Sequence, residues 1–241
     1  MKASYAHYTL HFRQPAGTSR GVLTDKETYF LKLEDEDMPG VFGLGECAVF
    51  RGLSADDVPA YEDKLRELCA NISADKETDM HEFPSIRFGL ETAINDFANG
   101  CRRQPFPSDF TEGMSAIPIN GLVWMGTKEE MLHRIDDKIK AGFTTIKLKV
   151  GAIDTESELD LVRHIRKVFP PEVLTIRLDA NGGFTPDNAL QKLSDFARYG
   201  IHSIEQPIKQ GQWEAMRRIC SESPIDIALD EELIGIHTPE R

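Results

Sequence analysis

The chain has 241 residues, 40% of them hydrophobic, which is enough for one large domain or two smaller ones with a substantial core. Its 28 Lys and Arg residues stand against 40 Asp and Glu, and the net charge of −12 argues against nucleic acid or an anionic membrane as a partner. The sequence has neither a long apolar run, which would predict membrane insertion, nor an apolar N-terminal segment, which would predict secretion. The four scattered cysteines (Cys47, Cys69, Cys101 and Cys220) fit a reduced, cytoplasmic protein.

The first part of the chain, up to about residue 110, predicts an α+β domain. Residues 7–12, 27–34 and 41–50 have strand character, and helical patterns follow at 54–72 and 84–100. Strands followed by helices are typical of α+β units. The stretch "RRQPFPSDF" (102–110) then contains two prolines, which predicts a linker.

From residue 111 onward, strands and helices alternate. Strands are predicted at 117–124, 144–150, 174–181, 202–208 and 225–231. Helices lie between them, with capping boxes at Thr127–Glu130 and Thr155–Glu158 and an N-cap with proline at Thr185–Pro186. This alternation predicts parallel strands in sequential order with helices outside, most naturally an incomplete (β/α) barrel. A doubly wound open sheet is the alternative, although no glycine-rich nucleotide-binding motif follows any strand.

Charged residues are expected on one face of these strands. In "TTIKLKV" (144–150) the apolar residues share one face, so Lys147 and Lys149 share the other. Asp179, Glu205 and Asp230 likewise come late in the following strands, opposite the apolar residues. In a barrel this face is the interior, and the C-terminal strand ends form the mouth where active sites are built.

Three converging acids would repel one another unless they bound a cation. An all-oxygen set without His or Cys suits Mg²⁺. A lysine beside such a site indicates removal of a proton next to a carboxylate group. A salt bridge or helix cap is the structural alternative for any single acid, and charge balance is the alternative for the lysines.

Four motifs in this order, "KLKVG", "RLDANGGF", "IEQPI" and "LDEELIG", resemble the muconate-lactonizing branch of the enolase superfamily. Residues 15–23, 43–54 and 84–97 are most similar to the o-succinylbenzoate synthases of that branch. The resemblance implies an α+β capping domain (1–110) and a partial (β/α) barrel (111–241). It also implies a Mg²⁺-dependent carbon–oxygen lyase that dehydrates a cyclohexadiene carboxylate to o-succinylbenzoate, through an enediolate, in menaquinone biosynthesis.

Carried over residue by residue, the resemblance makes Lys149 the general acid and base. It would remove the α-proton and then protonate the departing hydroxyl, with electrostatic support from Lys147. Asp179, Glu205 and Asp230 would be the Mg²⁺ ligands.

The resemblance also implies residues around this centre. Around the Mg²⁺ ligands, the resemblance places three residues that are expected to contact and orient them: Asn181, Glu231 and Arg177. A capping-domain loop with Thr18, Ser19 and Arg20 is expected to close over the substrate, and a plain surface turn is the alternative. The expected partner is therefore a small carboxylate substrate.

One departure from the family pattern stands out. The family has a further active-site lysine on the sixth barrel strand, whereas this chain ends with "GIHTPER" after the fifth predicted strand. We therefore expect a fragment or a truncated product, with little synthase activity of its own and open sheet edges that favour aggregation or a homo-oligomer. An epimerase, racemase or cycloisomerase of the same superfamily, and a non-catalytic metal-binding product, are the alternative functions.

Overall fold

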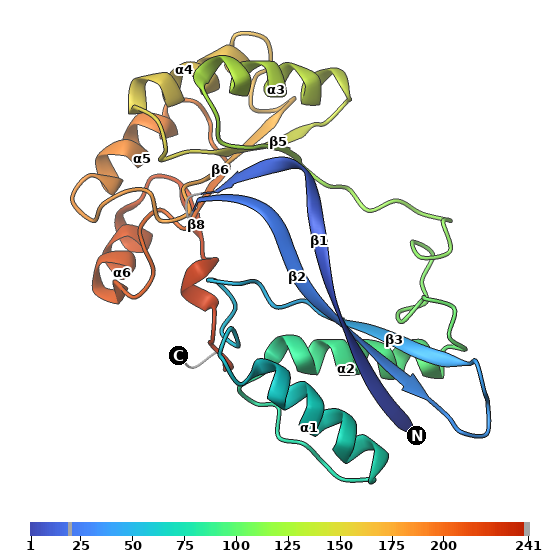
Figure 1. Cartoon of the computed structure of the whole chain (residues 1–241). Helices are drawn as coiled ribbons and strands as arrows, with labels where there is room; N and C mark the ends of the chain where they lie inside the picture. The colour runs from blue at the N-terminus through green and yellow to red at the C-terminus, as the bar shows by residue number, and fades with distance from the viewer. Residues whose placement is uncertain (19–20, 239–241) are drawn as a thin grey trace. The chain divides into compact units, whose positions relative to one another are not determined.

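Figure 1 presents a computed structural model of the chain that describes residues 1–18 and 21–238. The chain forms two compact units, of which the first comprises Met1–Ala16 and Leu23–Ile117 and the second is built mainly from Pro118–Arg241. Each unit has a hydrophobic core of its own. Within the two described ranges, no helix combines the length and the apolar character that crossing a bilayer requires.

The first unit contains a three-stranded sheet and two helices (Figure 1). Strands β1 (Lys2–Thr18), β2 (Gly21–Glu34) and β3 (Phe42–Cys47) lie side by side in this order, and β2 pairs antiparallel with β3. Tyr29 and Leu31 alternate into the core from β2, as expected for a half-buried strand. The α+β architecture predicted from the sequence is confirmed.

Two element boundaries in this unit differ from the prediction. β1 extends far beyond the predicted 7–12, because most of its side chains are exposed and the apolar alternation that marks a strand is weak there. Helix α1 (Tyr61–Ser73) begins after Pro59 instead of at residue 54. A proline disfavours the helical conformation in the residue that precedes it, so the helix starts only beyond this point.

Helix α2 (Pro84–Ala98), predicted at 84–100, packs on β3 through direct backbone contact. A Cβ added at Gly45 would lie 1.8 Å from the carbonyl oxygen of Gly89, and one added at Gly89 would lie 2.3 Å from Sγ of Cys47. Glycine at both positions therefore lets the helix and the strand approach more closely than any side chain would permit.

Asp96 is fully buried on α2 and joins the helix to β3 and to the segment that follows the helix. Its Oδ2 accepts hydrogen bonds from the backbone N–H of Leu44 at 3.0 Å and from Nη1 of Arg103 at 2.5 Å. Its Oδ1 accepts one from the backbone N–H of Arg103 at 2.7 Å. These three donors offset the cost of burying the carboxylate.

The second unit is a five-stranded parallel sheet with helices along one face (Figure 1). The strand order follows the chain, as predicted. The strands are β4 (Gly121–Val123), β5 (Thr145–Lys149), β6 (Thr175–Asp179), β7 (Ser203–Glu205) and β8 (Asp226–Ala228). The helices are α3 (Lys128–Lys140), α4 (Thr155–Arg166), α5 (Ala189–Ala197), α6 (Trp213–Glu222) and the short 3₁₀ helix η1 (Glu231–Leu233).

Side chains alternate across this sheet as the sequence predicts. Ile146 and Leu148 of β5, with Ile176 and Leu178 of β6 and Ile204 of β7, are buried in the core shared with the helices. The opposite face carries the lysines and the carboxylates. The apolar face therefore holds the unit together and leaves the other face for charged groups.

One of the three predicted helix starts is confirmed and two are wrong. Thr127 and Glu130 form the predicted capping box of α3. In α4 the N-cap is Asp154 instead of Thr155, because its carboxylate accepts a hydrogen bond from the N–H of Ser157 and leaves Thr155 as the first helical residue.

The third predicted start, at Thr185–Pro186, falls before α5 begins. Thr185 and Asn188 exchange side-chain to backbone hydrogen bonds of 3.0 Å and 3.3 Å, which close a turn. The helix begins at Ala189, after this turn.

Asp96→Asn is expected to lower the free energy of unfolding of the chain by about 1.5–3 kcal/mol, because the substitution replaces charge-assisted hydrogen bonds inside the first unit with neutral ones. Urea denaturation followed by circular dichroism measures this change. Asp63→Asn is the matched control, since the ion pair between Asp63 and Arg66 on α1 is exposed. Equal effects of the two substitutions would contradict the role of Asp96.

Candidate active site

The ends of strands β5 to β7 bring a row of charged residues into register. Lys149 lies beside Asp179, and Asp179 lies beside Glu205. Because the three strands are parallel and in register, the side chains of this row project from the same face of the sheet, at the C-terminal ends of the strands. The sequence prediction that these residues meet at adjacent strand ends is matched by this register.

Asp179 is the centre of the row. It is fully buried, and its Oδ2 lies 2.6 Å from Nζ of Lys149 and 2.8 Å from Nζ of Lys147. Lys147 also contacts Oε2 of Glu205 at 2.7 Å. The two lysines therefore form ion pairs with two of the three predicted metal-binding carboxylates.

Asn181 extends this network beyond the end of β6. Its Oδ1 accepts a hydrogen bond from Nζ of Lys149 at 2.7 Å, and its Nδ2 donates to Oε1 of Glu231 at 3.1 Å. Its backbone N–H donates to Oδ1 of Asp179 at 3.1 Å. Asn181 adopts a left-handed backbone with φ of 44°, which an asparagine tolerates better than most residues. The ammonium group of Lys149 is therefore hydrogen-bonded to both Asn181 and Asp179.

The pKa values follow from the competition between burial and pairing. Burial alone would raise the pKa of Asp179, but hydrogen bonds from Lys147 and Lys149 outweigh it, and the pKa lies below its ordinary value. Burial likewise opposes the charge of Lys147, yet the two carboxylates raise its pKa. For Glu205, burial and the charge of Asp179 prevail over Lys147, so its pKa is raised.

Asp230 lies at the start of η1, two residues after Ala228, the β8 residue paired with Glu205. Burial raises the pKa of Asp230, and the negative charges of Glu231 and Asp179 raise it further. Among the described residues, however, the oxygens of the three predicted ligands do not all lie within 4.8 Å of one another. The structure brings Asp179 and Glu205 together around Lys147 and leaves Asp230 beside them.

The other predicted residues are placed differently. Arg177 lies two residues before Asp179 on β6, beside Lys147 in the sheet register; it is exposed, and within the described part of the chain its guanidinium makes no hydrogen bond or ion pair. Of the predicted substrate loop, Thr18 ends β1, while Ser19 and Arg20 lie outside the described residues.

The donor set fits a hard divalent cation. Asp179 and Glu205 direct oxygens toward one point, since a single ammonium group, that of Lys147, lies within 2.8 Å of both. Asp230, in the turn between β8 and η1, offers a third carboxylate beside them. Oxygen-only sets of this kind suit Mg²⁺.

A cavity of about 540 Å³ adjoins this network. It is lined by residues from the C-terminal ends of several strands, including Asn181, Glu231, Lys209 and the glycine pair Gly182–Gly183. The strands of this unit are parallel, so their C-terminal ends meet at the edge where ligands of such sheets bind. The cavity is large enough for a small organic molecule.

Two buried residues of this region were missed by the sequence prediction. Glu158, assigned to a capping box, is buried on α4 and its Oε1 accepts a hydrogen bond from the N–H of Gly151 at 2.5 Å. Gln206 lies within the predicted strand 202–208 without a role of its own, yet its buried side chain binds the segment that carries Asp230. The signal for Glu158 was its place on the apolar face of α4, with Val162 and Ile165.

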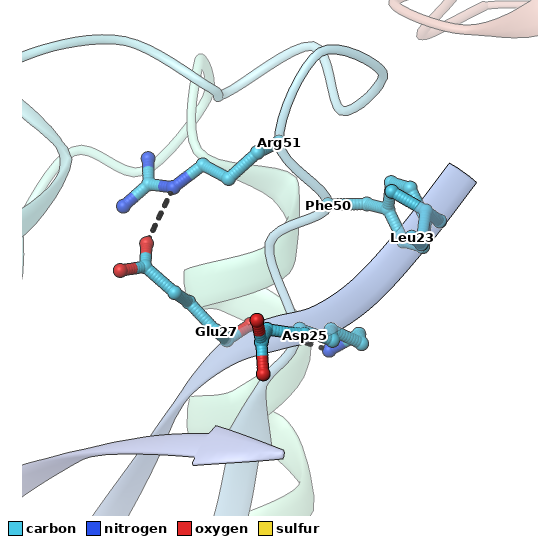
Figure 2. A pocket seen from close by; sticks show the side chains of 6 residues that line it. Leu23, Asp25, Glu27, Phe50 and Arg51 are labelled. Carbon is cyan, nitrogen blue, oxygen red and sulfur yellow. Dashed lines mark hydrogen bonds and ion pairs between the residues drawn. The ribbon is translucent and has the colours of Figure 1, made fainter. Parts of the chain in front are cut away.

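A second, smaller hollow of about 90 Å³ lies in the first unit (Figure 2). Arg51 at its edge donates from Nε to Glu27 at 2.9 Å and from Nη1 to Asp57 at 2.7 Å. The hydrogen bond from Arg51 lowers the pKa of Asp57. These contacts fix the turn after β3, and they give no acid–base pair that would indicate catalysis.

Comparisons with known proteins agree with this architecture. The family model described as "Enolase C-terminal domain-like" matches residues 130–241. The o-succinylbenzoate synthase of Desulfotalea psychrophila is 40% identical, and the match covers all of this chain and 74% of that protein.

Two solved structures are similar as well. The crystal structure of MenC from Desulfotalea psychrophila LSv54 superposes with a TM-score of 0.84 at 36% identity, covering 99% of this chain and 73% of that one. The o-succinylbenzoate synthase from Thermosynechococcus elongatus BP-1, complexed with Mg in its active site, gives a TM-score of 0.78 at 27% identity, covering 96% of this chain and 69% of that one.

Asp230→Asn is expected to raise the midpoint of thermal unfolding at pH 7 in the presence of a chelator. The folded chain raises the pKa of Asp230 above its ordinary value of 3.8, so ionisation of this group increasingly opposes folding as the pH rises. The gain should disappear below about pH 4, where the carboxylate is protonated in both states. Thermal scans from pH 3.5 to 8 measure the effect.

Asp226→Asn, at the exposed start of β8, is the control for this substitution. A fall in the unfolding midpoint of Asp230→Asn, or a change no larger than that of the control, would show that Asp230 does not face the acidic cluster.

Proposed function

Because the chain belongs to the o-succinylbenzoate synthases of the enolase superfamily, we propose that it carries the proton-transferring and metal-binding residues of a carbon–oxygen lyase. The reaction is the dehydration of a cyclohexadiene carboxylate to o-succinylbenzoate in menaquinone biosynthesis. The observation that carries the proposal is the row Lys149, Asp179 and Glu205, with both lysines hydrogen-bonded to the carboxylates.

Asp179, Glu205 and Asp230 would hold the Mg²⁺. Bound Mg²⁺ acts as a Lewis acid that stabilises the negative charge that develops on a substrate carboxylate during loss of the neighbouring proton. The relative with Mg in its active site supports this choice of ion. Asn181, Glu231 and Arg177 are proposed as supporting residues, and for Asn181 and Glu231 the hydrogen bond between their side chains supports that role.

Lys149 is the proposed acid–base residue. It is the last residue of β5, it contacts Asp179 and Asn181, and its side chain is only 16% exposed, so its ammonium group is held in one place. As a free amine it would accept the α-proton of the substrate, and as an ammonium group it would return a proton to the departing hydroxyl. One residue thus serves both halves of the dehydration.

Lys147 has a different environment. It bridges Asp179 and Glu205, and these carboxylates raise its pKa, which favours a permanently charged side chain. A fixed positive charge stabilises a developing carboxylate dianion and is poorly suited to accept a proton. Lys147 is therefore assigned an electrostatic role.

The remaining assignments belong to the same proposal. The substrate is a small carboxylate that enters at the C-terminal strand ends, beside the cavity of the second unit. The domain division at about residue 110, with an α+β capping domain that supplies the loop of Thr18, Ser19 and Arg20, follows from the family resemblance.

Lys149→Ala is expected to reduce turnover of the cyclohexadiene carboxylate by about 10²–10⁴-fold, since a positioned general acid–base residue contributes that much. Mg²⁺ affinity, measured by isothermal titration calorimetry, should change little, because the carboxylates remain. Lys147→Ala is the matched comparison and should cost less if its role is electrostatic only.

A loss below tenfold in Lys149→Ala would assign the acid–base role to another residue. Dipeptide epimerisation by the unmodified protein, without dehydration, would favour the epimerase alternative over the synthase.

Asp179→Asn is expected to weaken Mg²⁺ binding strongly while the far-ultraviolet circular dichroism spectrum stays unchanged. The substitution removes the carboxylate at the centre of the row but keeps its shape and its acceptor oxygen. Calorimetry that shows unchanged Mg²⁺ affinity would contradict the ligand assignment.

A further inference from the structure

Gln206 is fully buried directly after Glu205, and its backbone joins two neighbouring strand ends. Its N–H donates to the carbonyl oxygen of Ala228 in β8 at 2.9 Å. Its carbonyl oxygen accepts from the N–H of Gly182, in the loop after β6, at 2.7 Å. The backbone of Gln206 therefore connects the loop after β6 with β8, on the two sides of β7 in the sheet.

The side chain of Gln206 makes four further hydrogen bonds. Its Oε1 accepts from the backbone N–H groups of Asp230 and Glu232, both at 3.1 Å. Its Nε2 donates to the carbonyl oxygen of Ile208 at 2.9 Å and to Oε2 of Glu232 at 3.2 Å. An amide group has two donor hydrogens and an oxygen with two lone pairs, so all of its hydrogen-bonding capacity is used.

The backbone conformation of Gln206 is unusual. Its φ of 40° lies in the left-handed region, which non-glycine residues other than Asn, Asp and His rarely adopt. Glycine would fit this conformation more easily, but it would lack the amide that binds Asp230 and Glu232. The side-chain contacts explain why a glutamine occupies this position.

We infer that Gln206 is a positioning residue that sets the spacing of the three strand ends carrying Asp179, Glu205 and Asp230. Gln206 directly follows Glu205, and its hydrogen bonds reach Gly182 in the loop after Asp179 and the N–H of Asp230 itself. This inference rests on the proposed function, because the spacing of these carboxylates matters only if they share a cation.

A neutral amide is required at this position. Glu232 is buried, and its Oε1 accepts from the N–H of Gly211 at 2.8 Å, so its Oε2 remains directed at Gln206. A carboxylate at position 206 could still accept from Asp230 and Glu232, but its second oxygen would meet Oε2 of Glu232 and the carbonyl oxygen of Ile208. Two acceptors in contact without a proton repel each other, and the turn before η1 would move.

The test uses Gln206→Leu, which removes all four side-chain hydrogen bonds, and Gln206→Glu, which places two carboxylates in contact. Gln191→Leu on α5 is the matched control, because Gln191 is exposed and its amide bonds only Asp195. Mg²⁺ affinity of the 241-residue chain is measured by calorimetry. Residue-resolved hydrogen exchange reports on the amides of Asp230 and Glu232.

We expect both Gln206 variants to bind Mg²⁺ about 10–100-fold more weakly than the unmodified chain, as is usual when a residue that orients metal ligands is lost. In Gln206→Leu the amides of Asp230 and Glu232 should exchange about tenfold faster or more, since their acceptor is gone. The double variant Gln206→Glu with Glu232→Gln should recover much of the lost affinity, because a donor then faces the new carboxylate.

Unchanged exchange of both amides in Gln206→Leu would overturn the inference, and so would Mg²⁺ affinity within twofold of the control. Failure of the unmodified chain to bind Mg²⁺ would overturn the proposed metal site, and with it the link between Gln206 and metal ligands. The exchange rates of the Asp230 and Glu232 amides are measured without Mg²⁺, so they do not depend on metal binding. They therefore show whether Gln206 holds the turn before η1 even if the chain binds no Mg²⁺.

Discussion

The second unit depends on how a fully buried carboxylate is kept ionised. Asp179 receives two ammonium groups on one oxygen and a backbone N–H on the other, and these contacts hold its pKa below the ordinary value in spite of burial. Removing one partner of such a cluster leaves an uncompensated charge in the interior, at a cost of about 3–5 kcal/mol. The side-chain alternation of β5 and the parallel register of β5 with β6 are both needed, because a shift by one residue would turn the lysines toward the hydrophobic core.

Stability and chemistry place opposite demands on the same edge of the sheet. Glu205 and Asp230 have raised pKa values, so the fold gathers negative charge there without neutralising it fully. A structure built only for stability would replace such groups with neutral ones. The retained charge agrees with the proposed ligand site at this edge, and so do the left-handed backbones of Asn181 and Gln206 there.

The sequence predicted the parts of the structure that follow from local periodicity. Alternation located Lys147, Lys149, Asp179 and Glu205 on one face, and repeated strand–helix units predicted the strand order. Residues that act through distant partners were missed or misplaced. Glu158 matched a capping pattern but binds the N–H of Gly151, and Gln206 gave no periodic signal because its partners lie 24 and 26 positions further along the chain. The length of β1 was underestimated because its exposed side chains carry little apolar alternation.

The contact between Gly45 and Gly89 has a consequence for how this protein can vary. A Cβ added at Gly45 would meet main-chain atoms of Gly89 and Ala93, which are the same in every amino acid, so no exchange of neighbouring side chains can compensate for a bulkier residue at position 45. Sequence change in the first unit is thereby directed to the exposed helix faces and to the turns between elements. A mutant library designed to change substrate preference would accordingly contain more folded variants if it diversified the turn after β3 and kept Gly45 and Gly89 unchanged.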